Sequence, residues 1–171
     1  SNTYVGNTVL QDGTLIVATL GNSSGTTASS LGASGGAFQF NGNATLNFMY
    51  VGSGEVSTRP FQIATALTGA RTYRIDASGS GALALENFQN VSTNTFAVIL
   101  DLRGSSTESN RISSIITNNP ADNATPHIVK SDSGTWILDS NANTFFGGVR
   151  ADGGLLGLVA NESIGTPGFL A

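Results

Sequence analysis

The sequence predicts an all-β protein and, within that class, a β-solenoid, in which the chain winds in stacked coils of parallel strands. Two observations give the class: short apolar runs recur about every ten residues, and helical periodicity is almost absent. These two leave a sandwich, a barrel and a solenoid open. A motif near the start of the chain returns near its end, which favours the solenoid, because solenoid units bury their apolar faces by stacking on neighbours.

The expected strands are short apolar runs that lie near turn-forming residues such as Asp12-Gly13, Ser133-Gly134 and Gly153-Gly154. Taken in order along the chain, they are 14–17, 37–40, 45–50, 61–63, 72–75, 83–85, 97–102, 111–116, 127–130, 135–138 and 155–159. Only 64–70 and 113–117 show a spacing compatible with a turn or two of helix. In 14–17 and 135–138, alternation predicts that Leu15, Val17, Trp136 and Leu138 point inward.

The composition describes a folded, turn-rich chain with few charges. Charged residues make up 11% of the 171 residues and hydrophobic residues 39%, so Gly, Ser, Thr and Asn supply much of the remainder. The regular runs of Val, Ile, Leu and Phe argue against disorder. The 22 glycines have no three-residue period, which excludes collagen.

Charge, cysteine content and hydropathy exclude several partners and sites. The net charge is −4 and the basic residues are scattered, so neither nucleic acid nor an anionic membrane is an expected partner. Cysteine is absent, which excludes disulfides, thiolate metal sites and cysteine nucleophiles. No apolar run approaches about 18 residues, so no membrane insertion is expected within this segment, and any export signal or anchor is expected outside it.

The internal repeat relates the two ends of the chain. At an offset of 141 residues, six of the first fifteen positions match an identical or similar residue near the end of the chain. The matched pairs are Asn2 and Asn143, Thr3 and Thr144, Tyr4 and Phe145, Gly6 and Gly147, Gly13 and Gly154, and Leu15 and Leu156. After a change of length, Ser163-Ile164-Gly165 echoes Ser30-Leu31-Gly32. We therefore expect residues 1–171 to form a single solenoid segment, with related motifs in 1–32 and 142–171 and intervening coils in 33–141.

The stretches 128–138, 140–148 and 151–156 resemble the autotransporter-associated β-strand repeat, a passenger-associated family of bacterial surface proteins. Lys130, Gly134, Trp136 and Leu138 match that pattern, and residues 1–17 match its second half. The sequence departs from it where Phe146 replaces Thr, Val149-Arg150 replaces a Thr-rich pair, and Asp132-Ser133 replaces a small-Gly step.

The resemblance implies a right-handed parallel β-helix in the secreted passenger of a surface protein, located outside the cell or on the bacterial cell surface. It implies a role as a stalk, a fibre or filament, or an aid to folding during export. It implies no catalytic residues. Independently of the resemblance, the end coils of a solenoid leave backbone groups unpaired, so the segment needs caps, adjacent repeats or head-to-tail subunits, and the related motif at each end favours the last two.

Two charged tripeptides predict how successive coils stack. Arg74-Ile-Asp76 and Asp101-Leu-Arg103 carry opposite charges in reversed order, 27 residues apart. A coil of that length lies within the range of solenoid repeats. It would place Arg74 beside Asp101 and Asp76 beside Arg103, as ion pairs between coils.

The residues that carry chemistry do not form a recognisable active site in the sequence. His127 is the only histidine, and the G-x-S-x-G frames around Ser23 and Ser34 are not followed by a helical pattern, as a nucleophile elbow requires. Asp76, Glu86, Asp101 and Asp132 have no close second carboxylate in the sequence. We therefore expect no enzyme, no catalytic residues, no cofactor and no metal.

The expected function is that of a structural repeat. The alternative is an adhesin module that binds glycans or a host surface, for which exposed aromatic residues would serve as platforms. A more remote alternative is a β-helix enzyme that acts on polysaccharides. Of the adjacent aromatics Phe145 and Phe146, one should be exposed, because neighbouring strand residues face opposite ways.

Overall fold

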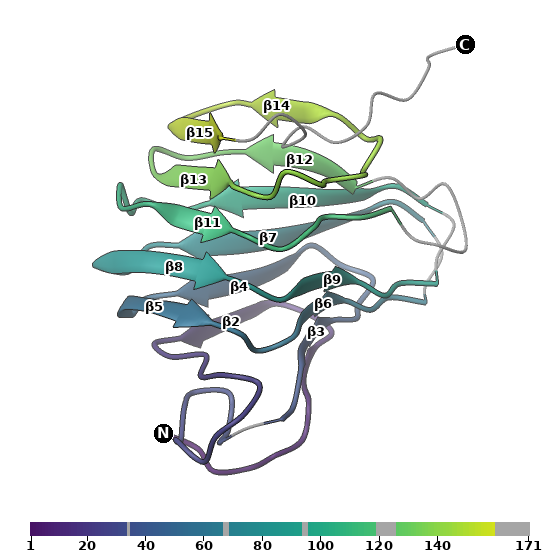
Figure 1. Ribbon diagram of the computed structural model, residues 1–171. Coiled ribbons are helices and arrows are strands. Elements are labelled where there is room, and N and C mark those ends of the chain that lie inside the picture. The colour runs from purple at the N-terminus through teal and green to yellow at the C-terminus, as the bar shows by residue number, and fades with distance from the viewer. Residues whose placement is uncertain (34, 67–68, 94–95, 119–125, 160–171) are drawn as a thin grey trace.

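The computed structural model describes residues 1–33, 35–66, 69–93, 96–118 and 126–159, and in this part of the chain every regular element is a strand. The strands form three parallel sheets whose members come from successive coils (Figure 1). Sheet 1 contains β1 (Thr8–Leu10), β3 (Phe38–Phe40), β6 (Phe61–Ile63) and β9 (Phe88–Asn90). Sheet 2 contains β2 (Thr14–Val17), β4 (Leu46–Tyr50), β7 (Arg71–Ala77), β10 (Val98–Arg103), β12 (Pro126–Lys130) and β14 (Val149–Ala151). Sheet 3 contains β5 (Ser53–Ser57), β8 (Gly81–Leu85), β11 (Asn110–Ile112), β13 (Thr135–Leu138) and β15 (Leu155–Leu158).

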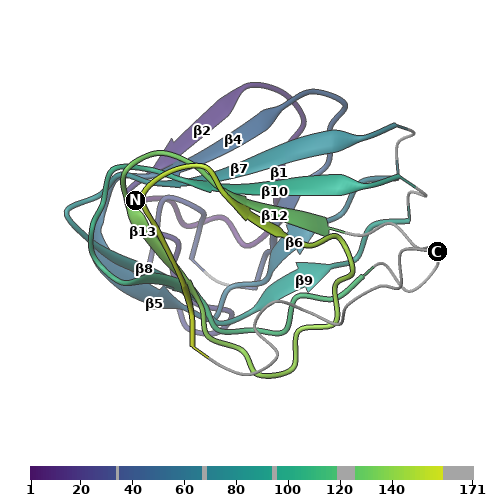
Figure 2. The same cartoon turned by 90° about the horizontal axis from the view of Figure 1, so that it is seen from above.

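The chain visits the three sheets in the same order in each coil. β3, β4 and β5 form one coil, β6, β7 and β8 the next, and β9, β10 and β11 the one after. The result is a β-solenoid of about four turns, as the sequence predicts. Seen along the stack, the three sheets face one another across a common interior (Figure 2). The 27-residue step predicted from the charged tripeptides is the register of β7 on β10, in which Asp101 lies opposite Arg74.

Inward-facing side chains form columns along the stack. Trp136 and Leu138 are fully buried and Val17 is buried, as alternation predicts, while Leu15 is partly buried against the core. Aromatic rings fill the part of the core beside sheet 1. The rings of Phe38 and Phe61 lie 4.6 Å apart, and the rings of Phe40 and Tyr73 are stacked 5.0 Å apart. The pleat thus converts alternating sequence into continuous apolar rows.

A ladder of glutamines runs along the outward face of sheet 1. Gln39 donates to Gln62 at 2.8 Å, and Gln62 donates to Gln89 at 2.7 Å. Each glutamine follows a phenylalanine that is stacked in register with the phenylalanines of the neighbouring coils. The ladder satisfies side-chain amides between coils, as Asn and Gln stacks do in other in-register sheets.

The structure also shows where the prediction of elements was incomplete. The expected strands correspond to observed ones within a few residues, but β1, β5, β9 and β14 were not predicted. The strand expected at 111–116 ends at Ile112, and 113–117 forms no helix. Two of the missed strands, β5 and β9, contain Gly, Ser, Gln or Asn, and strand pairing between coils fixes their conformation where local propensity does not.

The two related motifs occupy different positions in the solenoid. β2, which holds Leu15, lies in sheet 2, whereas β15, which holds Leu156, lies in sheet 3. Tyr4 is exposed, whereas Phe145 is fully buried. In the register of sheet 2, Leu15 is followed over five coils to Ala151 rather than to Leu156, so the offset of 141 is not a whole number of coils and matched residues fall on different sides of the stack. The match of Ser163-Ile164-Gly165 lies outside the described residues.

The N-terminal edge of sheet 3 is covered by the connection from β2 to β3. Ser57 donates its hydroxyl to the Gly21 carbonyl at 2.5 Å, and the Thr58 amide donates to Asn22 at 3.0 Å. Arg59, which is buried, donates to carbonyl oxygens of this connection, at Leu20, Gly32 and Gly36. Side chains thus take the place of a strand beside β5.

In the described part of the chain, no helix is long and apolar enough to cross a membrane.

Candidate functional site

The outward face of sheet 2 carries the charged residues of the two tripeptides, Arg74-Ile-Asp76 and Asp101-Leu-Arg103. Its outward side chains follow three columns along the stack. The first column holds Thr72, Ile99 and His127, the second Arg74, Asp101, Val129 and Arg150, and the third Asp76, Arg103, Ser131 and Asp152.

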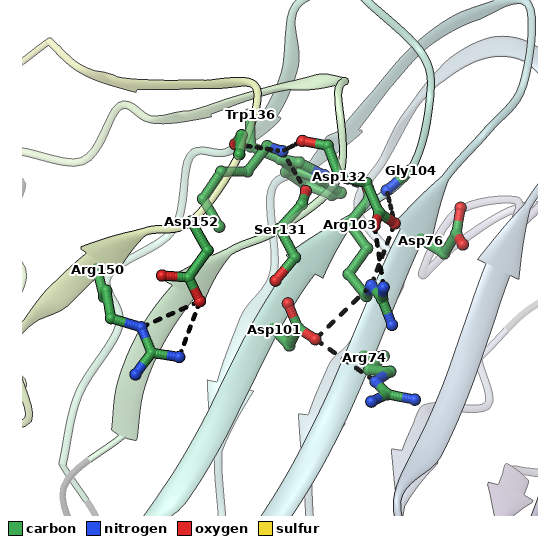
Figure 3. Close-up of polar contacts among 12 residues, drawn as sticks. Arg74, Asp76, Asp101, Arg103, Gly104, Ser131, Asp132, Trp136, Arg150 and Asp152 are labelled. Carbon is green, nitrogen blue, oxygen red and sulfur yellow. Dashed lines mark hydrogen bonds and ion pairs between the residues drawn. The ribbon is translucent and has the colours of Figure 1, made fainter.

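Asp101 is the centre of the ion pairs on this face. Arg74 Nε lies 3.4 Å and Arg103 Nε 3.7 Å from Asp101 Oδ2 (Figure 3). Arg103 lies opposite Asp76 in the register, but its guanidinium donates to both carboxylate oxygens of Asp132, at 2.9 and 3.1 Å. Asp76 accepts a hydrogen bond from the Ser78 hydroxyl at 2.5 Å. The structure therefore brings the predicted residues to one face, with Asp132 added to them.

We expect the charge exchange Arg74→Asp with Asp101→Arg to be tolerated better than either single change. Each single change places two like charges in neighbouring coils, whereas the exchange restores opposite charges. Because Arg74 is partly exposed, the coupling free energy should be small, about 0.2–1 kcal/mol. A double-mutant cycle from urea unfolding measures it, and additive single effects would show that the pair does not stabilise the stack.

Asp132 makes its bond to Arg103 from a left-handed backbone conformation. Its φ is 59°, the only positive value at a non-glycine position in the described chain. Glycine adopts this conformation without strain, whereas a residue with a Cβ does not. The hydrogen bond from Arg103 lowers the pKa of Asp132 below its ordinary value. The side chain thus gains a partner at the cost of backbone strain.

Asp132→Ala should destabilise the chain by about 1–2 kcal/mol, because alanine keeps the strain and loses the ion pair. Asp132→Gly should cost less, because glycine adopts positive φ freely. A carboxyl whose folded pKa is lowered stabilises above its unfolded pKa and loses this contribution as pH falls through the folded pKa. The difference between the natural chain and Asp132→Gly should therefore shrink below about pH 4. Urea unfolding at several pH values checks this, and equal costs for both variants would contradict it.

Lys130 occupies an inward position where neighbouring coils place aliphatic side chains. It is opposite Leu102 in the register and is fully buried. Its ammonium donates to the carbonyls of Ser131, of Asp132 at 3.0 Å and, in the next coil, of Gly153 at 3.2 Å. Burial lowers the pKa of Lys130. This motif lysine therefore links two coils at the turn between β12 and β13.

Other motif residues also form hydrogen bonds between coils or occupy turns that require glycine. Trp136 donates its indole N–H to the Arg103 carbonyl at 2.8 Å, and Asn143 accepts from the Ile116 amide at 2.8 Å. A Cβ at Gly134 would lie 2.6 Å from the carbonyl oxygens of Gly104 and Ser106, so only glycine fits. Gly13 and Gly154 both have positive φ.

The remaining motif residues lie near the ends of the described stack. The Thr144 amide donates to Ile116 O at 3.0 Å, and Gly147 packs on the Pro126 carbonyl. Asn2, Thr3 and Gly6 are exposed. Tyr4 shares a hydrogen bond of 2.5 Å with Thr8.

In the part of the chain that the structure describes, the candidate catalytic residues are not brought together. His127 is exposed on β12, and the Ser23 hydroxyl lies 3.2 Å from the Thr58 hydroxyl. Ser34 lies outside the described residues, and no described helix follows either serine frame. Among the described residues, no three His, Cys, Asp or Glu side chains group as metal ligands.

A groove of about 560 Å³ lies on this face between β10, β12 and β14. Ile99, Val129, His127 and Asp101 line it, with Arg150 and Asp152 also on its wall. Figure 3 shows the Arg150–Asp152 pair on one side of Asp101 and Arg74 on the other. The groove thus combines apolar surface, an imidazole, hydroxyls and paired charges.

Several structurally important residues escaped the sequence analysis. Buried Asn110 accepts from the Leu83 amide in one neighbouring coil and donates to the Thr135 carbonyl in the other, both at 2.9 Å. Nothing local distinguishes it or Arg59 from ordinary turn residues. The glutamine ladder had a signal, because the pair Phe-Gln occurs three times with spacings close to one coil.

Comparison with known proteins adds one relative. The chain is 35% identical, over 134 residues, to a protein named Adhesin BmaC autotransporter from Brucella suis biovar 1 (strain 1330). The match covers 75% of this chain but only 4% of the relative. No protein-family model and no solved structure matches the chain. The chain is thus similar to a small part of a much longer autotransporter adhesin.

Proposed function

We propose that this chain is a non-enzymatic repeat segment of an autotransporter-type protein on the bacterial cell surface, where it forms part of a rigid stalk. The observation that carries the proposal is the in-register stack of parallel coils, which extends along one axis. The similarity to an autotransporter adhesin supports the location. We also propose membership of the autotransporter-associated β-strand repeat family, on the motif that contains Lys130 and Trp136.

The proposed partners are further coils of the same kind, from adjacent repeats or from another subunit. β14 and β15 are the last described strands of sheets 2 and 3, and Leu155 and Leu158 are exposed on β15. The edge of a sheet can pair with another strand, and exposed apolar side chains favour packing against a further coil. A head-to-tail filament is the extreme case of such stacking.

Two deletions in the parent surface protein test the proposal. Deletion of residues 73–99 removes one complete coil, because Thr72 and Ile99 are register partners, and joins Thr72 to Leu100 in phase. Deletion of residues 86–99 instead joins a sheet 3 strand directly to a sheet 2 strand. The in-phase variant should reach the cell surface, whereas the out-of-phase variant should lose surface display. Antibody labelling and protease accessibility of whole cells measure display.

The outcomes separate the candidate functions. Equal display of both variants would show that coil register does not matter and would overturn the stalk proposal. Normal display of the in-phase variant with loss of attachment would favour the binding module. A polysaccharide-active enzyme is the weakest candidate, and turnover of a polyuronate by the purified chain would revive it.

A further inference from the structure

We propose that the groove on the outward face of sheet 2 binds a neutral carbohydrate, taking one pyranose unit through hydrogen bonds to Asp101 and His127 and apolar contact with Ile99 and Val129. This inference goes beyond the stalk role, and each can fail without the other. The shape of the groove, an unpartnered buried oxygen, the charge balance and the apolar floor all support carbohydrate binding.

Two glycines create the groove. The Ile128 amide donates to the Gly148 carbonyl at 3.1 Å, which places Gly148 beside His127 in the first outward column. Gly148 adds no side chain above His127, and a Cβ there would have no atom within 4 Å. Gly147 lies so close to Pro126 that its Cβ would be 2.2 Å from the Pro126 oxygen. The resulting volume of about 560 Å³ is within the range of small-molecule sites.

Asp101 supplies an acceptor that the protein does not satisfy. The residue is only 7% exposed, lines the groove, and uses Oδ2 for both of its ion pairs. Its Oδ1 is buried and has no hydrogen-bond partner in the described part of the chain. Leaving a buried acceptor unpaired is unfavourable. Because Asp101 lines the groove, a turn of its carboxylate would bring Oδ1 to a ligand hydroxyl, which supplies the missing donor.

The charges around the groove favour a neutral ligand. Each arginine already has a carboxylate partner: Arg74 pairs with Asp101 at 3.4 Å, Arg103 with Asp132 at 2.9 Å, and Arg150 with Asp152 at 2.8 Å. An anion would have to displace one of these carboxylates, and a cation would meet the arginines that flank Asp101. A polyhydroxylated neutral ligand breaks no ion pair.

The apolar part of the groove suits the C–H face of a sugar ring. Ile99 lies two residues before Asp101 on β10, Val129 lies opposite Asp101 on β12, and both line the groove. The exposed imidazole of His127 provides a further hydrogen-bonding group beside them. An apolar floor with a few convergent polar groups is the usual composition of a specific small-ligand site.

A matched pair of glycine substitutions tests the proposal on the full chain. Gly148 and Gly13 both have φ of 77° and open space around the Cβ position, but only Gly148 lines the groove. Asparagine tolerates this backbone conformation, so each Gly→Asn variant carries a similar strain. The probe is a glycan array of neutral oligosaccharides, including lactose, N-acetyllactosamine and cellobiose, beside sialyllactose and trigalacturonate. Calorimetric titration then gives the affinity of the best neutral ligand.

We expect the natural chain to bind a neutral oligosaccharide, Gly148→Asn to weaken that binding by at least about tenfold, and Gly13→Asn to leave it unchanged. Thermal unfolding of both variants reports whether they fold. If Gly148→Asn does not fold, His127→Ala tests the groove instead, because His127 is exposed and its truncation should leave the fold intact. Binding of acidic glycans only, binding unaffected by Gly148→Asn and His127→Ala, or no binding to the array would each overturn the proposal. Surface display in the deletion experiment is independent of these results.

Discussion

Arg59→Met should destabilise the chain by about 3–5 kcal/mol, although the substituted residue lies far from the motif that the family shares. The buried guanidinium donates from Nε to Leu20 O at 2.7 Å, from Nη1 to Gly36 O at 2.6 Å and from Nη2 to Gly32 O at 3.3 Å. Methionine fills similar volume but offers no donor, so three carbonyl oxygens lose a partner at once. The urea midpoint should fall, and native-state hydrogen exchange should rise first around β5 and the connection that covers it.

The same change should make stability more sensitive to pH. Burial raises the pKa of Glu55, and the nearby charge of Arg59 opposes that rise. Without Arg59 the folded pKa of Glu55 should rise further, so the protonated form is favoured more strongly in the folded state. A group with a raised folded pKa stabilises below its unfolded pKa and loses that contribution as pH rises through the folded pKa. The cost of Arg59→Met should therefore be smaller at about pH 4 than at pH 7.

Arg111→Met is the matched control for Arg59→Met. Arg111 is 43% exposed at its side chain and pairs with Asp139 at 3.4 Å, so its loss should cost less than about 1 kcal/mol. If the two variants prove equally stable, the connection from β2 to β3 does not depend on Arg59. A loss of stability in Arg59→Met but not in Arg111→Met would show that side chains, rather than a strand, protect the N-terminal edge of sheet 3.

The fold could be predicted because its determinants are periodic. Alternation in 135–138 gives the inward positions of Trp136 and Leu138, and the reversed charges of Arg74 and Asp101 give the coil length. The first pattern repeats the two-residue period of the pleat, and the second gives the 27-residue register step between β7 and β10. Adjacent Phe145 and Phe146 also divide between the core and the surface, with Phe146 45% exposed, although they lie in the connection between β13 and β14 rather than in a strand.

The candidate site could be predicted only in part, because its decisive features come from the stacking of coils. The unpartnered Oδ1 of Asp101 results from Arg74 and Arg103 both turning to Oδ2, and the groove results from Gly148 meeting His127. Neither is visible in the local sequence. The 141-residue repeat is visible in the sequence, but it does not indicate that the matched residues Leu15 and Leu156 lie on different sheets. Sequence similarity between two segments does not fix their rotation about the axis.

Trp136→Ala should also cost about 3–5 kcal/mol, and a comparison with Trp136→Phe separates packing from hydrogen bonding. Trp136 is fully buried in the column that contains Asn110 and Leu156, and its indole N–H donates to Arg103 O in the preceding coil at 2.8 Å. Alanine leaves a large cavity and an unpaired carbonyl. Phenylalanine fills most of the space and leaves only the carbonyl, so it should cost about 1–3 kcal/mol.

The location of the damage is more informative than its size. In a solenoid each coil contacts only its neighbours, so the loss should be greatest in β11, β13 and β15, which pair around Trp136, and weakest in β1 and β3. Residue-resolved hydrogen exchange of Trp136→Ala measures that gradient. Uniform loss of protection from β1 to β15 would mean that the coils unfold as one unit, whereas a graded loss would mean that stability passes from coil to coil. A stalk built in the second way can lose order locally while the coils farther along the stack remain folded.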